Sequence, residues 1–577
     1  MKTMIRLVRL GHETRWPFVL GAVLAFIVVL ANVALLGLAG WFIAAMAAAG
    51  IASAAINYFT PAAGIRGFAI MRTAGRYLER IVNHDATLRL LSRLRVWAYR
   101  RIEPLAPAVL ARYRSGDVLG RLVADVDTLD NAWLRVLTPA FVALTAAAAM
   151  IVFLLFFSVP VAFIDLALLA MVGVLFPFLI QRLAHRPAER AAALAGEIKA
   201  ELLDDFAGLA ELQILGADVP RREASTRRNR SLVREQDRGL AVEALATGGI
   251  VIATGTAICL TWLTVAPAAA SGRLDPLYLP LLVFFVLASL EAVQGLPGAF
   301  RALGDTLAAA RRVFQIADEP PAVIEIPDPI ETVGSCDLEV EAVRLRYGPE
   351  LGWALDGVDF TLPAGGAVAI VGPSGAGKSS LAQLLLRFRD PDGGTIRLGG
   401  EPIEKYSFEA LRSQFAWAAQ STRLFSTSLR ENLRLARPDA DDPMLWAALE
   451  ATGLAREVEA LERGLDSFVG AGGMMLSAGQ ARRLMLARAW LSPAPILLLD
   501  EPTEGLDAIN ERAIIDTLAG QRGGRSLLLI THRLAGLEKM DQIIVLDCGR
   551  VIERGRHAEL LALEGGLYRH MAEYIIS

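Results

Sequence analysis

Long apolar segments fill the first half of this chain and restrict what it can fold into. Six of them are long enough to cross about 30 Å of hydrocarbon as helices. They lie near residues 17–46, 51–71, 137–157, 161–181, 245–269 and 276–298. The chain has 577 residues, too many for one domain, and 54% of them are apolar, which is high for a soluble protein. We therefore expect an all-α, six-helix transmembrane domain in this half.

Basic residues precede the first apolar segment, as they do in a secretory signal peptide. The apolar run from 17 to about 46 is, however, roughly twice as long as the apolar region of a signal peptide. We therefore interpret this run as an uncleaved first span. The basic residues before it are Lys2, Arg6, Arg9 and Arg15.

The connections between the apolar segments alternate in length and charge. Those after the first and third segments, 47–50 and 158–160, are short and lack Lys and Arg, whereas those after the second and fourth are long and Arg-rich. The positive-inside rule predicts that the N-terminus, both long connections and the C-terminal half lie in the cytoplasm. Residues 84–104 and 188–216 keep apolar positions at helical spacing, so the spans should continue as helices beyond the membrane.

The stretch from Ser115 to Arg121 interrupts the first of these helical extensions. Ser115 and Asp117 are residues that favour the start of a helix. We expect a short helix that lies crosswise and touches a cytosolic partner. The alternative is an ordinary helix-turn-helix tip without a contact role.

Net charge and cysteine content exclude several other classes of protein. The formal net charge is −3, so no overall electrostatic attraction to nucleic acid is expected, and we predict no nucleic-acid partner. The three cysteines, Cys259, Cys336 and Cys548, are far apart and form no CxxC pair. Neither a disulfide framework nor a zinc site is indicated.

The composition of the chain changes after residue 317. Prolines and acidic residues mark a linker, and beyond it short apolar runs at 338–346, 367–371, 496–499 and 526–530 alternate with helical ones. Short strands between helices favour an α/β domain with a mainly parallel sheet. We expect a transmembrane domain over 1–317, a linker over 318–335 and an α/β nucleotide-binding domain over 336–577.

A complete phosphate-binding loop follows the apolar run at 367–371. Its glycines let backbone N–H groups converge on phosphate oxygens, and the helix that it opens adds a partial positive charge. Lys378 should reach the β- and γ-phosphates, and the Ser379 hydroxyl should hold Mg²⁺. ATP and Mg²⁺ are therefore the expected cofactors. The residues expected around the phosphates are Gly372, Pro373, Ser374, Gly375, Ala376, Gly377, Lys378, Ser379 and Ser380.

Two carboxylates end the apolar run at 496–499. Asp500 would hold Mg²⁺, and Glu501 would polarise the attacking water as a general base. The alternative is a pair of carboxylates at a helix N-terminus before Pro502.

Taken in order, these motifs resemble the ATP-binding cassette of ABC transporters over about 240 residues. The resemblance rests on the phosphate loop, Gln420, the Leu-Ser-Ala-Gly-Gln segment at 476–480, Asp500-Glu501, Asp507 and His532. Two positions depart from the usual pattern of the family. Ala478 stands where Gly is usual, and Glu504-Gly505-Leu506 precedes Asp507 where the family usually has Ser-Ala-Leu.

The resemblance to this cassette implies roles for the remaining site residues. Ser477, Gly479 and Gln480 would contact ATP that a second chain holds, and Asp507 would organise the dimer seam. Tyr347 would stack on adenine; otherwise it is a core aromatic residue. Gln420 would join Ser379 and Asp500 at Mg²⁺, and His532 would touch the γ-phosphate, so the catalytic residues are Glu501, His532 and Gln420.

The second apolar segment continues into a series of basic residues on one helical face. Arg72, Arg76, Arg80 and His84 follow one another at intervals of four residues, after Arg66. Each Arg at mid-bilayer costs roughly 2.5–3.5 kcal/mol on the insertion scale. Either they lie at the interface and in the cytoplasm, paired with Glu79 or headgroups, or they line a water-filled cavity that attracts carboxylates. In the second case His84 is free to ligate metal or haem iron.

Two stretches of the membrane half are similar to the CydC-type subunits of heterodimeric ABC exporters needed for cytochrome bd assembly. They are residues 32–42 and 76–87, followed by Leu94-Arg95 and Pro104-Leu105. The resemblance implies a half-transporter in the bacterial inner membrane with a CydD-type partner. It also implies a cargo of haem or of small thiols, cysteine and glutathione, and it puts His84 where the family has a haem-linked histidine.

We therefore expect an ATP-driven exporter subunit, with His84, Arg72, Arg76 and Arg80 as the candidate residues for haem or substrate. Charge does not decide between haem propionates and glutathione carboxylates. Two alternatives stay open: an exporter that flips lipids, and a haem-sensing membrane ATPase that transports nothing.

Overall fold

The computed structural model of the chain divides into two compact units, which we describe separately. The membrane unit comprises Met1–Pro104 and Tyr113–Glu319, and the ATP-binding unit comprises Leu105–Arg112 and Pro320–Ser577. The structure describes residues 2–12, 15–113, 115–420, 423–470, 473, 475–506, 508–520 and 522–576.

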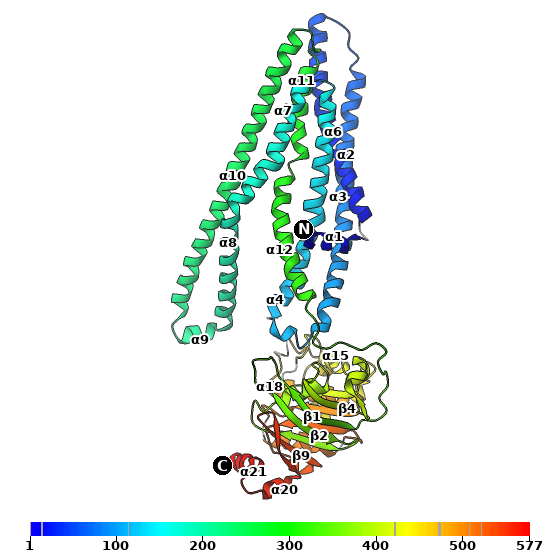
Figure 1. Cartoon of the computed structure of the whole chain (residues 1–577), viewed down its shortest axis with the longest axis vertical. Helices are drawn as coiled ribbons and strands as arrows, with labels where there is room; N and C mark the ends of the chain where they lie inside the picture. The colour runs from blue at the N-terminus through cyan, green and yellow to red at the C-terminus, as the bar shows by residue number, and fades with distance from the viewer. Residues whose placement is uncertain are drawn as a thin grey trace. The chain divides into compact units, whose positions relative to one another are not determined.

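The membrane unit consists of helices, most of them long and lying side by side (Figure 1). Short π-helical and 3₁₀ pieces connect or interrupt them at Arg121–Asp125 (η4), Ala132–Leu137 (η5), Met171–Leu175 (η6) and Leu290–Ala292 (η7). The α-helices are α1 (Lys2–Leu10), α2 (Arg15–Ala52), α3 (Phe59–Ile102), α4 (Ser115–Gly120), α5 (Val126–Leu129), α6 (Thr138–Leu155), α7 (Val159–Ala170), α8 (Phe176–Ala207), α9 (Leu209–Ile214), α10 (Asp218–Ala270), α11 (Tyr278–Ser289) and α12 (Leu296–Ala317).

Five helices within the described residues are long and apolar enough to cross a membrane. They are Arg15–Ala52, Gly116–Leu155, Val159–Ala184, Asp218–Ala270 and Tyr278–Ala317, and each overlaps most of one predicted span. The predicted span at 51–71 is the exception, because residues 54–58 are not helical and α3 begins at Phe59. Arginines interrupt the apolar character of α3, yet α3 packs along α2.

Close packing between helices of the membrane unit depends on glycine. A Cβ atom on Gly75 of α3 would lie 2.8 Å from Cγ2 of Val28 on α2, and one on Gly40 of α2 would lie 2.7 Å from the carbonyl oxygen of Pro280 on α11. Small residues let helix backbones approach where apolar burial gives little drive in lipid. These glycines therefore hold α3 and α11 close against α2.

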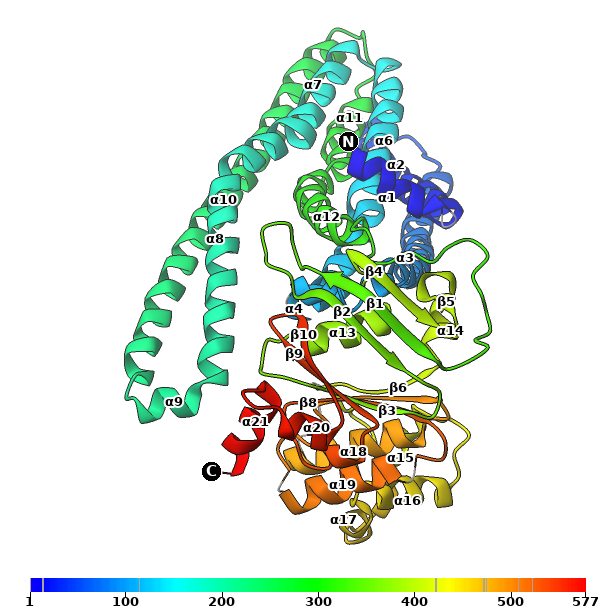
Figure 2. The same ribbon diagram turned by 60° about the horizontal axis from the view of Figure 1, so that its bottom comes forward.

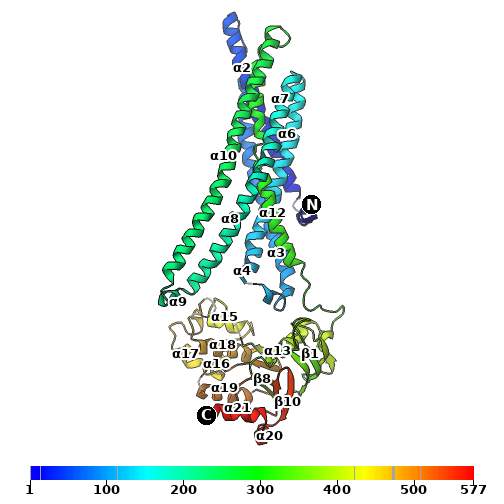
Figure 3. The same cartoon turned by 60° about the vertical axis from the view of Figure 1, so that its left-hand side comes forward.

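The helical extension predicted at 188–216 is present. Helix α8 runs to Ala207, α9 turns the chain, and α10 returns beside α8 (Figure 3). Arg221 on α10 lies 2.6 Å from Asp205 on α8, so an ion pair joins the two helices near this turn.

The segment Ser115–Arg121, which we expected to form a short crosswise helix, continues into a longer helix. Residues Ser115–Gly120 do form a helix, but this helix is the beginning of one long helical stretch that continues to Leu155. It is instead Leu105–Arg112, just before it, that belongs to the ATP-binding unit. The apolar residues Leu105, Ala108 and Val109 are buried there, which the charge pattern of the sequence did not indicate.

The ATP-binding unit contains two sheets with helices around them (Figure 2). One is antiparallel, in the order β2-β1-β4-β5, and the other has six strands in the order β10-β9-β3-β8-β7-β6. The larger sheet is parallel except for β10. The strands are β1 (Leu338–Leu345), β2 (Leu355–Leu362), β3 (Ala367–Val371), β4 (Gly393–Leu398), β5 (Glu401–Pro402), β6 (Phe415–Ala418), β7 (Ile496–Asp500), β8 (Ser526–Thr531), β9 (Gln542–Asp547) and β10 (Arg550–Gly555).

Helices follow most of the strands of this unit and cover the larger sheet. Strands β3, β7 and β8 are buried along their whole length, as expected for parallel strands with covered faces. The helices are α13 (Lys378–Leu385), α14 (Phe408–Arg412), α15 (Leu429–Arg434), α16 (Asp442–Ala451), α17 (Ala455–Glu459), α18 (Ala478–Leu491), α19 (Ala508–Gly520), α20 (His557–Ala562) and α21 (Leu567–Ile576).

Candidate functional site

Three neighbouring parallel strands end beside one another and carry the predicted catalytic groups. In the register of the sheet, Val371 of β3 lies opposite Thr531 of β8, and Ile530 of β8 lies opposite Asp500 of β7. The residues that follow are the phosphate loop, His532 and Glu501. Ligands of open α/β sheets bind at the carboxyl ends of strands, so the sequence motifs meet where this fold binds ligands.

The phosphate loop is shaped by glycines that approach other backbone closely. A Cβ atom on Gly377, where φ is +101°, would lie 2.3 Å from the carbonyl oxygen of Ala354. The loop leads into α13, whose first residue is Lys378. The Lys378 ammonium donates to the carbonyl oxygens of Gly372 (2.8 Å) and Pro373 (3.0 Å). These bonds hold the lysine at the loop, from which it can reach a phosphate.

Lys378 also lies close to the carboxylate predicted to act as general base. Its Nζ atom is 3.9 Å from Oε1 of Glu501, and both side chains are buried. Burial lowers the pKa of the Lys378 ammonium below its ordinary value, and the carboxylates of Glu501 and Asp500 offset part of this decrease. The two acidic neighbours therefore favour the charged form of the lysine, which phosphate binding needs.

Glu501 is fixed from two sides. Its Oε2 atom lies 2.7 Å from Nδ1 of His532, and its backbone N–H donates to the carbonyl oxygen of Ile530 at 2.8 Å. The residue adopts a left-handed backbone conformation, with φ of +51°. Strained backbone of this kind persists where the surroundings enforce it, and it concentrates at functional sites.

Asp500 and Ser379 fit the requirements of a magnesium site. Asp500 is buried, and its Oδ1 atom has no hydrogen-bond partner within the described part of the chain. Burial raises the pKa of the Asp500 carboxyl and Glu501 adds to the rise, whereas the Ser379 hydroxyl and Lys378 oppose it. Hydroxyl and carboxylate oxygens are hard ligands suited to Mg²⁺. When bound, the ion would neutralise charge on the phosphate oxygens.

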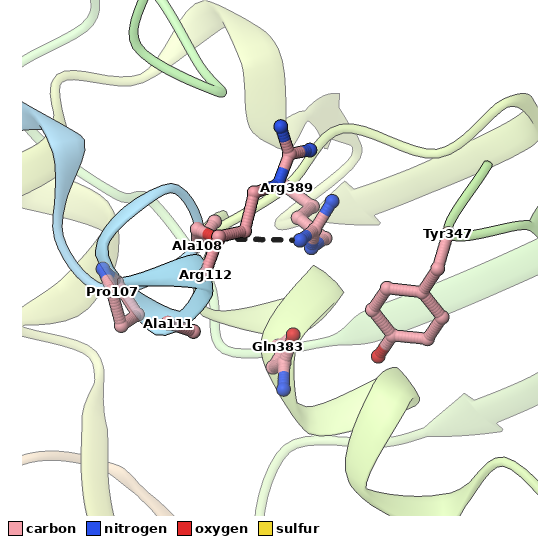
Figure 4. A pocket seen from close by; sticks show the side chains of 7 residues that line it. All are labelled: Pro107, Ala108, Ala111, Arg112, Tyr347, Gln383 and Arg389. Carbon is pink, nitrogen blue, oxygen red and sulfur yellow. Dashed lines mark hydrogen bonds between the residues drawn. The ribbon is translucent and has the colours of Figure 1, made fainter. Parts of the chain in front are cut away.

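Tyr347 lies beside the phosphate-loop helix rather than in the core. It is 40% exposed, and its hydroxyl is 2.9 Å from the Ser380 hydroxyl. The Arg389 guanidinium lies 4.9 Å from the centroid of its ring and also donates to the carbonyl oxygen of Ala108 at 3.4 Å. Together with Gln383 these residues line a pocket (Figure 4). An exposed ring beside the phosphate loop can stack on a nucleotide base.

The Ser-Ala-Gly-Gln segment forms the start of α18. Ser477 accepts from the backbone N–H of Gln480 (3.2 Å), and the Gln480 side chain accepts from the backbone N–H of Ser477 (2.8 Å), which is a capping box. Ala478 is the first helical residue and needs no left-handed conformation, so alanine is accommodated there. A Cβ atom on Gly479 would lie 3.2 Å from Leu506, so glycine keeps this contact loose. The start of a helix offers free N–H groups to an anion.

Gln420 is exposed, and its backbone is held by a residue that the sequence did not single out. Arg482 of α18 donates to the carbonyl oxygen of Gln420 at 2.7 Å and pairs with Glu504 at 3.2 Å. It thereby connects the helix that starts at Ser477 with two other segments of the site. Its position, two residues after Gln480 in the motif helix, is the only signal that the sequence offered.

Asp507 lies outside the described residues, but the segment before it is anchored. Arg533 donates to the carbonyl oxygen of Leu506 (3.4 Å) and pairs with Glu511 (2.7 Å), which in turn accepts from the Thr503 hydroxyl at 2.8 Å. Sequence reasoning missed Arg533 and Glu511. Arg533 directly follows His532, but a buried Glu511 cannot be recognised from its charged neighbours in the sequence.

In the membrane unit the structure separates the four basic candidates into two pairs. Arg72 donates to Asn32 of α2 at 3.1 Å, and Arg76 pairs with Glu291 of η7 at 2.5 Å. Arg80 and His84 lie further along α3, and both are exposed. The sequence offered Glu79 as a partner for the arginines, yet Glu79 accepts a hydrogen bond from Asn83 at 2.6 Å. Glu291 was missed because 215 residues separate it from Arg76.

A helical membrane unit and a cassette of this geometry define the class of an ABC exporter. Residues 355–504 match the family model for the ABC transporter, and the whole chain resembles the solved structure of a bacterial Atm1-family ABC exporter with ATP bound. In that comparison the TM-score is 0.83 at 25% identity, with 97% of this chain and 98% of the other covered. The chain is therefore an ABC half-exporter and a multi-pass membrane protein, and its ATP hydrolysis is coupled to transport.

Two curated relatives specify the family within this class. The chain is 39% identical over 571 residues to the glutathione/L-cysteine transport system ATP-binding/permease protein CydC of Escherichia coli, with 99% of each chain covered. It is 36% identical over 585 residues to the CydC protein of Haemophilus influenzae, with 100% of each covered. The chain belongs to the CydC family of ABC transporter proteins.

Proposed function

We propose that this chain is one half of a heterodimeric exporter that uses ATP to move small thiols of the cysteine and glutathione type toward the periplasm, in support of cytochrome bd assembly. The observation that carries the proposal is similarity over the full length of relatives named for glutathione and L-cysteine transport. The arginines of α3 add support, because they offer cationic groups to a cargo that carries carboxylates.

Nucleotide handling in this proposal follows from the contacts at the three strand ends. The Lys378 ammonium, which contacts the carbonyl oxygens of the loop, is placed to bind the β- and γ-phosphates, while Tyr347 stacks on the base. Glu501 accepts a proton from the attacking water as that water adds to the γ-phosphorus, the bond from this phosphorus to the β,γ-bridging oxygen breaks, and ADP leaves. His532 orients Glu501 through its Nδ1 atom. Ser379, Gln420 and Asp500 hold Mg²⁺, and the remaining phosphate-loop residues supply backbone N–H groups.

In this proposal, the functional transporter is formed by this chain and a second half-transporter. Ser477, Gly479 and Gln480 at the start of α18 cap the γ-phosphate that a CydD-type partner holds, and Asp507 lies at the seam between the cassettes. We place the N-terminus and the cassette in the cytoplasm of a bacterial cell, because the positive-inside rule favours that side of the inner membrane for the Arg-rich connections. The domain bounds 1–317, 318–335 and 336–577 belong to the same proposal.

Uptake by inverted inner-membrane vesicles tests the proposal. Cells that lack endogenous CydC-type proteins would express this chain with its partner, and the vesicles would receive labelled cysteine or glutathione. We expect accumulation that needs ATP and that disappears with Glu501→Gln. ATP-dependent flipping of lipid without thiol uptake would favour the flippase alternative, and ATP hydrolysis without movement of thiol, haem or lipid would favour a sensor.

Haem is a second candidate cargo because His84 is exposed on α3 one helical turn after Arg80. An exposed imidazole can act as an axial ligand of haem iron, and an arginine can bind a propionate. Haem titration of the purified heterodimer, followed at the Soret band, tests this candidate. A change in band position and affinity on His84→Ala is expected, and an unaltered spectrum would exclude His84 as the ligand.

A further inference from the structure

A cluster of four polar side chains joins α2, α3 and η7 inside the membrane unit. The Asn32 amide accepts from Arg72 through Oδ1 (3.1 Å) and donates to Oε2 of Glu291 through Nδ2. Arg76 donates to Oε1 of Glu291 at 2.5 Å. The three charged side chains sum to +1, so the cluster carries one positive charge that no carboxylate within it balances.

The position of the cluster makes it costly and therefore informative. Asn32 lies near the middle of α2, a 38-residue helix with a mean hydropathy of 2.8 over its most apolar window. Ionisable groups at this depth are rare, and as a rule they face a cavity and take part in function. Arg76 is 53% exposed and Arg72 and Glu291 are partly exposed, so the cluster is not closed off by the rest of this chain.

The Asn32 amide presents two opposite chemical groups to its neighbours. Its carbonyl oxygen faces the guanidinium of Arg72, where a carboxylate would bind more strongly. Its NH₂ group faces the carboxylate of Glu291, where an ammonium group would bind more strongly. The Asn32 amide thus occupies, without net charge, the positions that a carboxylate and an ammonium group of one zwitterionic molecule could take.

We propose that this cluster binds the zwitterionic α-amino-acid group of the cargo. The α-carboxylate replaces the Asn32 carbonyl oxygen at Arg72, and the α-ammonium replaces the Asn32 NH₂ group at Glu291. Arg76 holds Glu291 in place. Glu291 can hold the ammonium and Arg76 together, because one bond from each uses only two of the roughly four acceptor sites of its carboxylate.

This inference rests on the proposed thiol transport and makes it more specific. Cysteine and glutathione share one chemical group besides the thiol, a free α-ammonium beside a free α-carboxylate. A site that recognises this group accepts both molecules. Haem carries propionates but no ammonium group, so the site discriminates against haem.

Selective competition measures both halves of the recognition. The chain would be reconstituted with its partner in phosphatidylcholine vesicles, because the quaternary ammonium of this headgroup has no N–H to donate to Glu291, unlike the primary ammonium of ethanolamine and serine headgroups. Uptake of labelled cysteine would be measured in the presence of an unlabelled competitor. The competitors are cysteine itself, N-acetylcysteine, which lacks the ammonium, and cysteamine, which lacks the carboxylate. We expect the two truncated compounds to compete roughly 10- to 100-fold more weakly than cysteine.

Two variants should each abolish one part of this selectivity. In Glu291→Gln, unlabelled cysteine should compete about 10- to 100-fold more weakly than in the unaltered complex, and no better than N-acetylcysteine. Cysteamine should still compete more weakly than cysteine. In Arg72→Gln, cysteine should instead compete no better than cysteamine. Arg89→Gln is the matched control, since it removes an exposed pair with Asp85 on the same helix and should change neither ratio.

The possible results separate this inference from the transport proposal. No ATP-dependent uptake of cysteine or glutathione by the unaltered complex would overturn the proposed function itself. Uptake in which N-acetylcysteine and cysteamine compete as well as cysteine would overturn the cluster assignment alone. Equal loss for all compounds in both variants would show that the cluster only holds α2, α3 and η7 together. If Glu291→Gln fails to assemble, Glu291→Asp, which keeps the charge, provides the test and should retain the selectivity.

Discussion

At the scale of single residues, Glu501 combines three features that suit a general base. It is buried, it is oriented by His532 at 2.7 Å, and its backbone is held in the left-handed region. A carboxylate fixed in this way pays little reorganisation cost when water binds beside it. The carboxylate is therefore the group whose removal should stop chemistry without removing nucleotide.

Replacing Glu501 by Gln should separate binding from hydrolysis. Glutamine keeps the size of the side chain but cannot take the proton, so single-turnover hydrolysis at this site should fall by about 10²- to 10⁴-fold. ATP affinity, measured by equilibrium binding, should stay within about threefold of the unaltered protein, since Lys378 and the loop remain. Glu538→Gln, at an exposed pair with Arg512, is the control and should not alter hydrolysis. Unchanged single-site turnover in Glu501→Gln would remove Glu501 from the mechanism.

Tyr347 gives a second prediction at this scale, because its ring and its hydroxyl have separate contacts. Tyr347→Phe loses only the bond to Ser380 and should bind ATP nearly normally. Tyr347→Ala loses the stacking surface, worth about 1–3 kcal/mol for a base on an aromatic ring, and affinity should fall about 5- to 100-fold. Binding of a fluorescent ATP analogue measures both. If the two variants weaken binding equally, the hydroxyl rather than the ring carries the role.

At the scale of elements, α18 has a cap that serves both stability and the proposed contact with ATP. Ser477 closes the capping box with Gln480, and Gln480 is in turn fixed by a 2.6 Å bond to Glu457. The start of the helix is therefore rigid before any phosphate arrives. Ser428 caps α15 in the same unit through a 3.1 Å bond and provides a comparison without a proposed role at ATP.

Serine-to-alanine changes at these two caps should have equal structural and unequal functional effects. Each should destabilise the ATP-binding unit by about 1 kcal/mol, read from denaturant unfolding of the purified complex. Only Ser477→Ala should also reduce ATPase activity, by about 10-fold or more, at the site whose ATP the partner holds. Equal ATPase activities in the two variants would limit Ser477 to a capping role.

Elements were predictable wherever the signal is local in sequence. The spans, the extensions of α3 and α8, and strands β3, β7 and β8 follow from apolar runs and their spacing. The start of α3 at Phe59 was misjudged, because an apolar segment from 51 to 71 does not reveal that residues 54–58 connect two helices. The role of Leu105–Arg112 was missed for a related reason: it depends on burial against the ATP-binding unit, and charge pattern does not report burial.

At the scale of the whole molecule, the proposed heterodimer requires this chain to supply half of each composite ATP site. Glu501 would act on the ATP that this chain holds, whereas Ser477 would act on the ATP of its partner. The consecutive residues of the phosphate loop and Asp500-Glu501 were predictable as a site because parallel strands bring their carboxyl ends together. The contacts of Arg76 with Glu291 and of Arg482 with Gln420 were not predictable, since they join distant segments that only packing brings together.

The most direct test of the account is the distance between the start of α18 and the partner's phosphate loop. Met475 is 71% exposed and lies two residues before Ser477, so a spin label on Met475→Cys can be paired with a label in that loop after Cys259, Cys336 and Cys548 are replaced. The account predicts that a non-hydrolysable ATP analogue shortens this distance in the reconstituted heterodimer. Saturating nucleotide, confirmed as bound, that leaves the distance as long as in the nucleotide-free complex would contradict the account.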